Sequence, residues 1–211
     1  MMKEITLYDV LGVLAPGTVI TVGLVTLYPE LTTIITRKEF TIGDFGLIVL
    51  VSYVAGNLVA AVGHFIEMPL WKIRGGSPTD RARIDSSGIL SKREQDAVQD
   101  KLRQLKMIGD DETIAKLKSN DWWSIARRIY TYVEARGVTR RIDLFNAQYG
   151  MNRGIAAGFF VLLLIMLFRS GISSWRIEGV LAACVGLSLY RMNRFSRYYA
   201  TELFRQFLIA P

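Results

Sequence analysis

Four long apolar stretches alternate with charged segments along this chain. They lie at about residues 10–28, 45–65, 154–168 and 175–190. A helix that crosses the hydrocarbon core of a bilayer needs roughly 20 apolar residues. The first two stretches reach that length, whereas the last two are short, and a buried helix of a soluble domain is the alternative for the fourth. The pattern predicts an all-α, polytopic membrane protein with four transmembrane helices.

A polar segment between the second and third stretches shows the periodicity of helices rather than strands. Ser91 followed by Glu94 is a capping box that opens a helix with one apolar stripe. A second helix is expected to begin at Asp121 and to stop at Gly137. The apolar positions that follow suggest a third helix, which runs on into the third apolar stretch.

Basic residues set the predicted orientation. Residues 71–153 hold 17 Lys and Arg and the residues after the fourth stretch add four, whereas the two linkers on the other side of the membrane hold two each. Lys and Arg are enriched on the cytoplasmic side of membrane proteins. The polar segment and both termini are therefore expected in the cytoplasm. The first stretch is too long for the apolar part of a signal peptide, so we expect it to remain in the mature protein.

These patterns divide the chain into four expected parts. Residues 1–70 hold transmembrane helices 1 and 2, and residues 71–150 form a helical cytoplasmic insert between helices 2 and 3. Residues 151–192 hold transmembrane helices 3 and 4. Residues 193–211 form a basic amphipathic tail, which either extends the fourth helix or lies on the inner leaflet.

The composition excludes several kinds of site. Of the 211 residues, 51% are hydrophobic, and there is one Cys and one His. A disulfide framework and a metal centre built on several His or Cys residues are thereby excluded. No catalytic residue, metal or cofactor is expected. The net charge of +7 is explained by topology and attraction to the inner leaflet, so we do not expect direct nucleic-acid binding.

The second stretch carries a predicted polar intramembrane face. At 100° per residue, Tyr53, Asn57, Ala60 and His64 fall on one side of the helix, with Glu67 at its flank. Polar groups inside a bilayer normally face a helix bundle, a water path or one another. Three hypotheses remain open: hydrogen bonds to a neighbouring helix, a pore or proton path along Asn57, His64 and Glu67, and a catalytic pair of His64 and Glu67.

Small residues predict close contacts between helices. Gly56 and Ala60 would let another helix approach the second stretch, together with Ser52 and Gly63. The third stretch begins with glycines at a strict spacing of four, namely Gly150, Gly154 and Gly158. We interpret this doubled G-x-x-x-G pattern as a packing face that favours assembly into an oligomer.

Pro16 and Gly17 interrupt the first stretch near its middle. Proline removes one helical hydrogen bond and clashes with the preceding turn. A static kink and a gating hinge are both compatible with these two residues.

Three short pieces carry a resemblance. They are Tyr8-Asp9-Val10-Leu11-Gly12 leading to Ala15-Pro16-Gly17, then Tyr53-Val54-Ala55-Gly56 with Gly63-His64, and the end of the chain, which is rich in Arg, Tyr and Phe. Together they resemble a broad group of uncharacterised bacterial membrane proteins of about this size, some of which belong to anti-phage defence systems. The resemblance covers most of the chain through short, apolar motifs. It implies a bacterial inner-membrane protein with a soluble partner or a second-messenger trigger.

The expected function follows from these observations together. We expect an oligomeric inner-membrane protein that acts as a pore-forming effector or membrane sensor in anti-phage defence, with an insert that binds a partner or signal. Its expected partners are the lipid bilayer, further copies of itself and a soluble cytoplasmic protein. The alternative is a non-conducting membrane anchor for a soluble defence protein, and the third possibility is an intramembrane enzyme.

Overall fold

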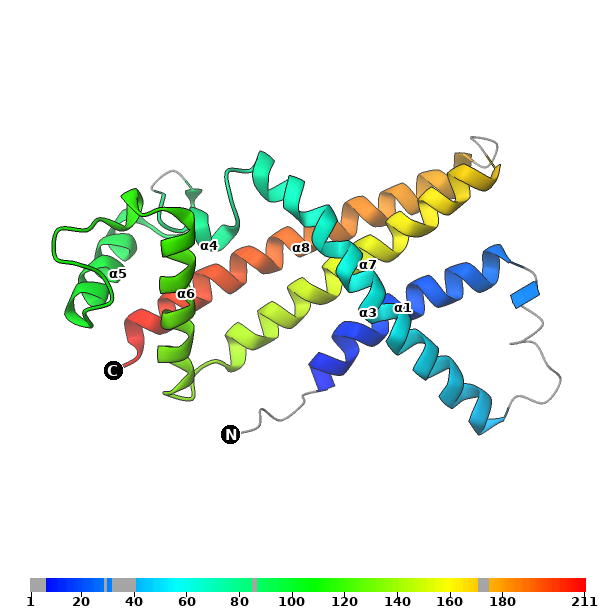
Figure 1. Ribbon diagram of the computed structural model, residues 1–211, viewed down its shortest axis with the longest axis horizontal. Helices are drawn as coiled ribbons and strands as arrows, with labels where there is room; N and C mark the ends of the chain where they lie inside the picture. The colour runs from blue at the N-terminus through cyan, green and yellow to red at the C-terminus, as the bar shows by residue number, and fades with distance from the viewer. Residues whose placement is uncertain (1–6, 29, 32–40, 85–86, 171–174) are drawn as a thin grey trace. The chain divides into compact units, whose positions relative to one another are not determined.

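The computed structural model describes residues 7–28, 30–31, 41–84, 87–170 and 175–211, and every regular element within them is a helix (Figure 1). This confirms the predicted all-α class for the described residues. In chain order the elements are α1 (Leu7–Leu27), α3 (Ile42–Ile73), α4 (Pro78–Arg81), α5 (Lys92–Gln104), the 3-10 helix η2 (Ile114–Lys116), α6 (Ser119–Glu134), α7 (Arg140–Ser170) and α8 (Trp175–Ile209).

Among the described residues, three helices are long and apolar enough to cross a membrane. By length and composition these are Val10–Leu27, the helix that begins at Ile42 and the helix Arg140–Arg169. In α8 the uncharged stretch runs only from Gly179 to Tyr190, and it is shorter than the roughly 20 residues that a transmembrane helix needs. Three of the four predicted transmembrane helices therefore have the required length and composition. Arg37 and Lys38, in the first linker used for the orientation, lie outside the described residues.

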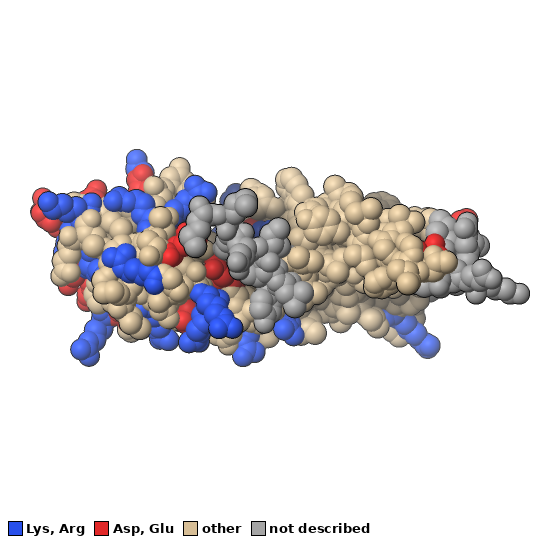
Figure 2. Space-filling view, turned by 90° about the horizontal axis from the view of Figure 1, so that it is seen from below, with Lys and Arg blue, Asp and Glu red and all other residues tan. Residues whose placement is uncertain are grey.

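The chain divides into two compact units, and their boundaries differ from the expected ones. One unit comprises Met1–Met68 with Ala147–Asn193, and the other comprises Pro69–Asn146 with Arg194–Pro211. The second unit holds 19 Lys and Arg against 12 Asp and Glu, whereas the first holds seven of each, so the whole net charge of +7 belongs to the second unit. We call them the apolar unit and the basic unit. Figure 2 shows Lys and Arg gathered over the basic unit and a largely uncharged surface on the apolar unit.

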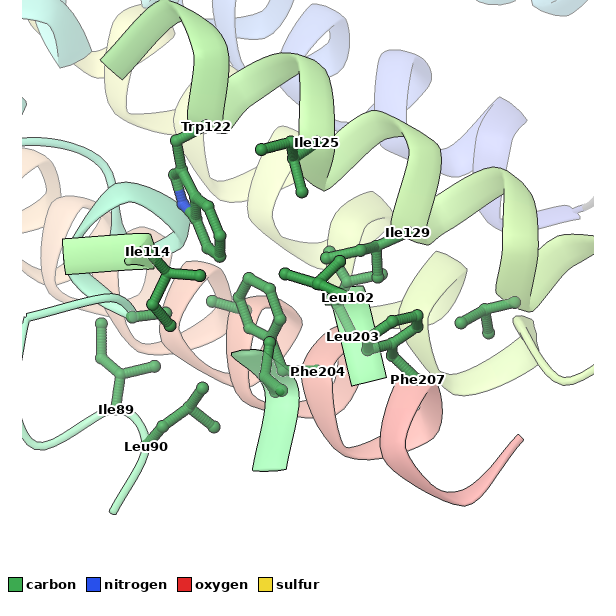
Figure 3. Close-up of a cluster of buried hydrophobic side chains, with 14 of the residues drawn as sticks. Ile89, Leu90, Leu102, Ile114, Trp122, Ile125, Ile129, Leu203, Phe204 and Phe207 are labelled. Atoms are coloured by element: carbon green, nitrogen blue, oxygen red, sulfur yellow. The ribbon is translucent and has the colours of Figure 1, made fainter. Parts of the chain in front are cut away.

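The basic unit has its own hydrophobic core, to which the end of the chain contributes. Trp122 of α6 stacks on Phe204 of α8, with ring centroids 5.6 Å apart. Both side chains are almost fully buried, as are Leu203 and Phe207. Figure 3 shows these side chains of α6 and α8 in one cluster with Leu102 of α5. Most of the expected tail, residues 193–211, thus continues α8, which ends at Ile209, and its side chains Leu203, Phe204 and Phe207 pack in this core.

The polar segment folds largely where its capping residues predict. The Ser91 side chain accepts a hydrogen bond from the Glu94 backbone N–H, and the Glu94 carboxylate accepts one from the Ser91 backbone N–H, which confirms the capping box. Gly137 closes the turn that follows α6, with a φ of 72°, a conformation that favours glycine. The predicted start of α6 at Asp121 is wrong, because the helix begins at Ser119 and Asp121 lies in its first turn.

The apolar unit is held together by close helix contacts near its centre. Gly17 of α1 lies directly against the backbone of Ser52 and Gly56 on α3. Away from this contact α3 exposes large apolar side chains, including Leu58, which is 67% exposed. A helix with such an exposed apolar surface suits a lipid environment rather than water.

Candidate functional site

A cluster of charged and polar side chains joins α3 to α7 within the apolar unit. The buried side of α3 is a line of small residues that ends in a carboxylate, with Ser52, Gly56, Val59, Gly63 and Glu67 at spacings of four, three, four and four. Such spacings place all five on one helical face. A Cβ on Gly63 would lie 2.9 Å from Cγ of Arg153, so this glycine leaves the space in which Arg153 runs along α3.

Glu67 is the centre of the cluster. It is only 6% exposed, and Nη1 of Arg153 lies 3.2 Å from both of its carboxylate oxygens. The hydroxyl of Tyr149 donates to Oε2, and Nδ1 of His64 lies 3.1 Å from Oε1. A buried carboxylate is costly unless it is paired and hydrogen-bonded. The cluster therefore satisfies the charge of Glu67 and ties α3 to α7.

The cluster lies at the charged ends of two apolar stretches. Glu67 comes just before Pro69 and Lys72, where the apolar part of α3 ends, and Arg153 comes just before Gly154, where the apolar run of α7 begins. The Arg153 guanidinium also lies 5.5 Å from the centre of the Tyr149 ring. Ion pairs of this kind are tolerated at helix ends because long side chains reach toward the headgroup region.

The four residues of the predicted polar face do not stay together. Glu67 is buried in the cluster, whereas Tyr53, Asn57 and His64 are exposed in the single chain. Nδ2 of Asn57 donates to the backbone oxygen of Tyr53, 2.9 Å away on the preceding turn. His64 takes part in both groups, because its ring is 61% exposed while Nδ1 reaches Glu67. The remaining exposed polar residues form a line along α3, which we call the polar line: Tyr53, Asn57 and His64.

The predicted packing residues make contacts within one chain. Gly56 lies against the backbone of Val13, and Ala60 is half-buried. A Cβ on Gly154 would lie 2.7 Å from Cγ of Pro16, and a Cβ on Gly158 would lie 3.4 Å from Cγ1 of Val19. The glycine pattern of α7 thus receives α1 of the same chain, so it does not support an oligomer.

Gly150 stands apart from the other two glycines of the α7 pattern, because a Cβ there would meet nothing within 4 Å.

Pro16 and Gly17 are packing residues in this structure. Both are buried, and α1 is assigned as helix from Leu7 to Leu27 across them. Pro16 fills the space that Gly154 leaves, and Gly17 meets the backbone of α3. These contacts explain why a proline and a glycine occupy the two positions.

Tyr149 was missed by the sequence analysis as a partner of Glu67. A pattern that could have identified it is the spacing of four between Tyr149 and Arg153, which places both on one face of α7. Tyr149 and Arg153 lie just before the apolar run of α7, and Glu67 lies near the end of the apolar part of α3, so all three are at the ends of apolar stretches. The pairing itself depends on which side of α3 meets α7, and a helical period alone does not contain this information.

The described part of the chain gathers no group of three His, Cys, Asp or Glu residues that could hold a metal ion. Comparisons with protein-family models, with curated proteins and with solved structures found no match for this chain.

Proposed function

We propose that this chain is a bacterial inner-membrane protein whose copies associate through α3 and form an ion-conducting pore. The observation that carries the proposal is the polar line. It is exposed on a helix that is apolar and long enough to cross a membrane. Polar side chains inside a bilayer are costly unless they face protein or water, so a second copy of the chain or a water path should cover them.

The geometry of α3 leaves this face available. One side of the helix is occupied by α1 and α7 through Gly56 and Gly63. The opposite side exposes apolar residues such as Val54 and Leu58, which suit lipid. At 100° per residue the polar line lies between these two sides. Copies arranged in a ring could therefore turn the polar line inward while keeping the apolar side in contact with lipid.

The charge distribution supports the orientation. The basic unit carries the whole net charge of +7, and positive segments are kept on the cytoplasmic side. We therefore place the basic unit in the cytoplasm and propose α8 as the fourth, short transmembrane helix. Labelling tests this: a Cys introduced at Ser77, in a Cys184→Ser background, should resist an impermeant thiol reagent added outside intact cells. Labelling from outside would reverse the topology.

Crosslinking tests self-association through the polar line. In the Cys184→Ser background, Asn57→Cys and His64→Cys should each form disulfide-linked dimers in native membranes. Leu58→Cys is the matched control, because Leu58 is exposed on the lipid side of the same helix. Equal crosslinking at Leu58 and Asn57, or none at either polar position, would contradict the proposed interface.

Ion flux tests conduction separately. Proteoliposomes with the wild-type protein should release a trapped ion, and Asn57→Leu should reduce the release while the protein still crosslinks through His64→Cys. Wild-type vesicles that stay tight, with crosslinking intact, would favour the alternative function of a non-conducting anchor. The folded core of the basic unit supports that alternative, because it offers a soluble partner a stable surface.

The defence role and the cytoplasmic trigger are proposals of the same kind. The resemblance to membrane proteins of anti-phage systems supports them, and the basic unit is the part of the chain that we propose to bind a soluble protein or a messenger. Cells that carry the gene should survive phage challenge better than cells that carry Asn57→Leu. If the wild-type and Asn57→Leu genes protect cells equally, the polar line is not needed for a defence role.

An intramembrane enzyme is the least supported alternative. Glu67 is engaged by Arg153, Tyr149 and His64 at once. Within the described residues we find no Ser, Cys or Thr hydrogen-bonded to His64, as nucleophilic catalysis would need.

A further inference from the structure

Three aromatic rings cluster on the basic unit, on the surface formed by α7 and α8. The ring of Phe145 lies 5.5 Å from that of Tyr198 and 6.5 Å from that of Phe195. The rings of Phe195 and Tyr198 are 6.1 Å apart and almost perpendicular. These separations fall in the range of favourable ring pairs. Tyr198 nevertheless remains 39% exposed, so the cluster is a surface feature and not part of the core.

Two arginines lie over this aromatic cluster. The guanidinium carbon of Arg141 is 5.9 Å from the centre of the Phe145 ring, and that of Arg194 is 5.4 Å from the centre of the Tyr198 ring. Nε of Arg194 also donates to the Tyr198 hydroxyl at 2.7 Å. An arginine held against a ring keeps its planar group oriented, so it loses less freedom when it binds an anion.

The electrostatic surroundings favour an anion. Glu202 lies 3.5 Å from Arg141 and offsets part of its charge, and Asp143 accepts the hydroxyl of Tyr130. The unit as a whole still carries a net charge of +7. Arginine is suited to phosphate because its parallel N–H groups can bind two oxygens at once.

The cluster lies close in sequence to the ends of two apolar stretches, which favours a lipid headgroup as the source of the phosphate. Arg194 comes four residues, about one helical turn, after Tyr190, the last residue of the uncharged stretch of α8. Phe145 precedes the apolar run of α7 by fewer than three turns. Tyrosine and arginine at such positions lie at the depth of lipid headgroups.

We propose that this aromatic and arginine cluster binds the headgroup of an anionic phospholipid in the inner leaflet. Arg141 and Arg194 would donate to the phosphate, and Tyr198 would pack against the glycerol region. The inference rests on the proposed orientation, in which the basic unit is cytoplasmic, and on α8 as a short transmembrane helix, but it requires neither self-association nor conduction.

Lipid binding is measured on the full-length protein in detergent. Phosphatidylglycerol should bind more tightly than phosphatidylcholine and should raise the unfolding temperature more. The double variant Arg141→Gln/Arg194→Gln should bind phosphatidylglycerol about tenfold more weakly, the scale of a lost charge-assisted hydrogen bond. Arg194→Lys keeps the charge but lacks the planar guanidinium, so its affinity for phosphatidylglycerol should lie between those of the wild type and the double variant.

Arg127→Gln provides the matched control. Arg127 also lies over an aromatic ring of the basic unit, 3.8 Å from the centre of Trp123 on α6, and its loss changes the net charge by the same amount per residue. It should bind phosphatidylglycerol as the wild type does.

Several outcomes would overturn the proposal. A loss in Arg127→Gln as large as that in Arg194→Gln alone would show general attraction by net charge. Equal stabilisation by phosphatidylcholine would remove the anionic preference, and competition by millimolar inorganic phosphate would identify a soluble anion as the ligand. Outside labelling of Ser77→Cys with lipid binding intact would refute the proposed orientation and the inner leaflet as the source of the lipid. Absent lipid binding with a protected Ser77→Cys would refute the lipid site and leave the orientation in place.

Discussion

Gly17 of α1 lies so close to Ser52 of α3 that any side-chain atom at position 17 would overlap the Ser52 backbone oxygen. In the same way, a side-chain atom at Gly56 of α3 would overlap the backbone oxygen of Val13 on α1. Two helices therefore cross backbone to backbone, a geometry that small residues permit in membranes, where dispersion contacts replace the hydrophobic effect.

Gly17→Ala should separate this crossing. Because the added methyl group would meet backbone atoms, which cannot rotate away, we expect a clear loss of thermal stability in detergent. Gly150→Ala and Gly186→Ala are matched controls in α7 and α8, since a Cβ there meets nothing within 4 Å. They should keep the wild-type unfolding temperature, and a Gly17→Ala protein as stable as these controls would contradict the crossing.

Removing Glu67 alone should lower the free energy of unfolding more than replacing both members of the Glu67–Arg153 ion pair. Glu67→Ala leaves Arg153 without its carboxylate, and breaking a buried pair costs about 3 kcal/mol. Replacing both partners by apolar residues, as in Glu67→Leu/Arg153→Met, should recover much of this loss. Denaturation of the purified protein in mixed micelles would measure the difference, and a double variant less stable than Glu67→Ala would refute the pairing.

Phe204→Ala should destabilise the basic unit by about 4 kcal/mol, because a fully buried aromatic side chain leaves a cavity and loses its stacking on Trp122. Ile209→Ala is the control on the same helix. Its side chain is 76% exposed, so the change should stay within about 0.5 kcal/mol. Tryptophan fluorescence of the full chain during denaturation would report both. A similar cost at the two positions would argue against the C-terminal segment as a core element.

Acid should weaken the start of α5. The hydrogen bond from the Ser91 backbone, together with that from Arg205, holds the pKa of Glu94 below its ordinary value of 4.5. A carboxyl group with a lowered pKa in the folded state stabilises the protein above its unfolded pKa. That contribution is lost as the pH falls from about 4.5 through the lowered value. Glu94→Gln should therefore show a smaller drop in stability between pH 6 and pH 3 in denaturation experiments. An unchanged slope would exclude Glu94 as a source of the acid sensitivity.

The sequence alone determined the features that depend on local chemistry. The capping box at Ser91 and Glu94 predicted the start of α5, because a helix terminus needs partners for its free N–H groups wherever it lies. The apolar lengths predicted membrane helices, since spanning a bilayer depends on length and composition. The buried face of α6, from Trp122 to Val133, likewise follows the helical period of its apolar residues.

Tertiary structure decided which of several possible faces is covered. The helical period gives α3 one side with polar residues and another with small residues, and it does not say which of them is buried. The close approach of α1 at Gly17 buries the side with small residues and leaves Asn57 exposed. The same holds for Gly154, whose neighbour is Pro16 of its own chain, and for Phe204, which packs on α6 rather than on a membrane surface. A helix displays all its faces to the solvent or lipid equally, and only the neighbouring helix, brought from far along the chain, determines which face is buried.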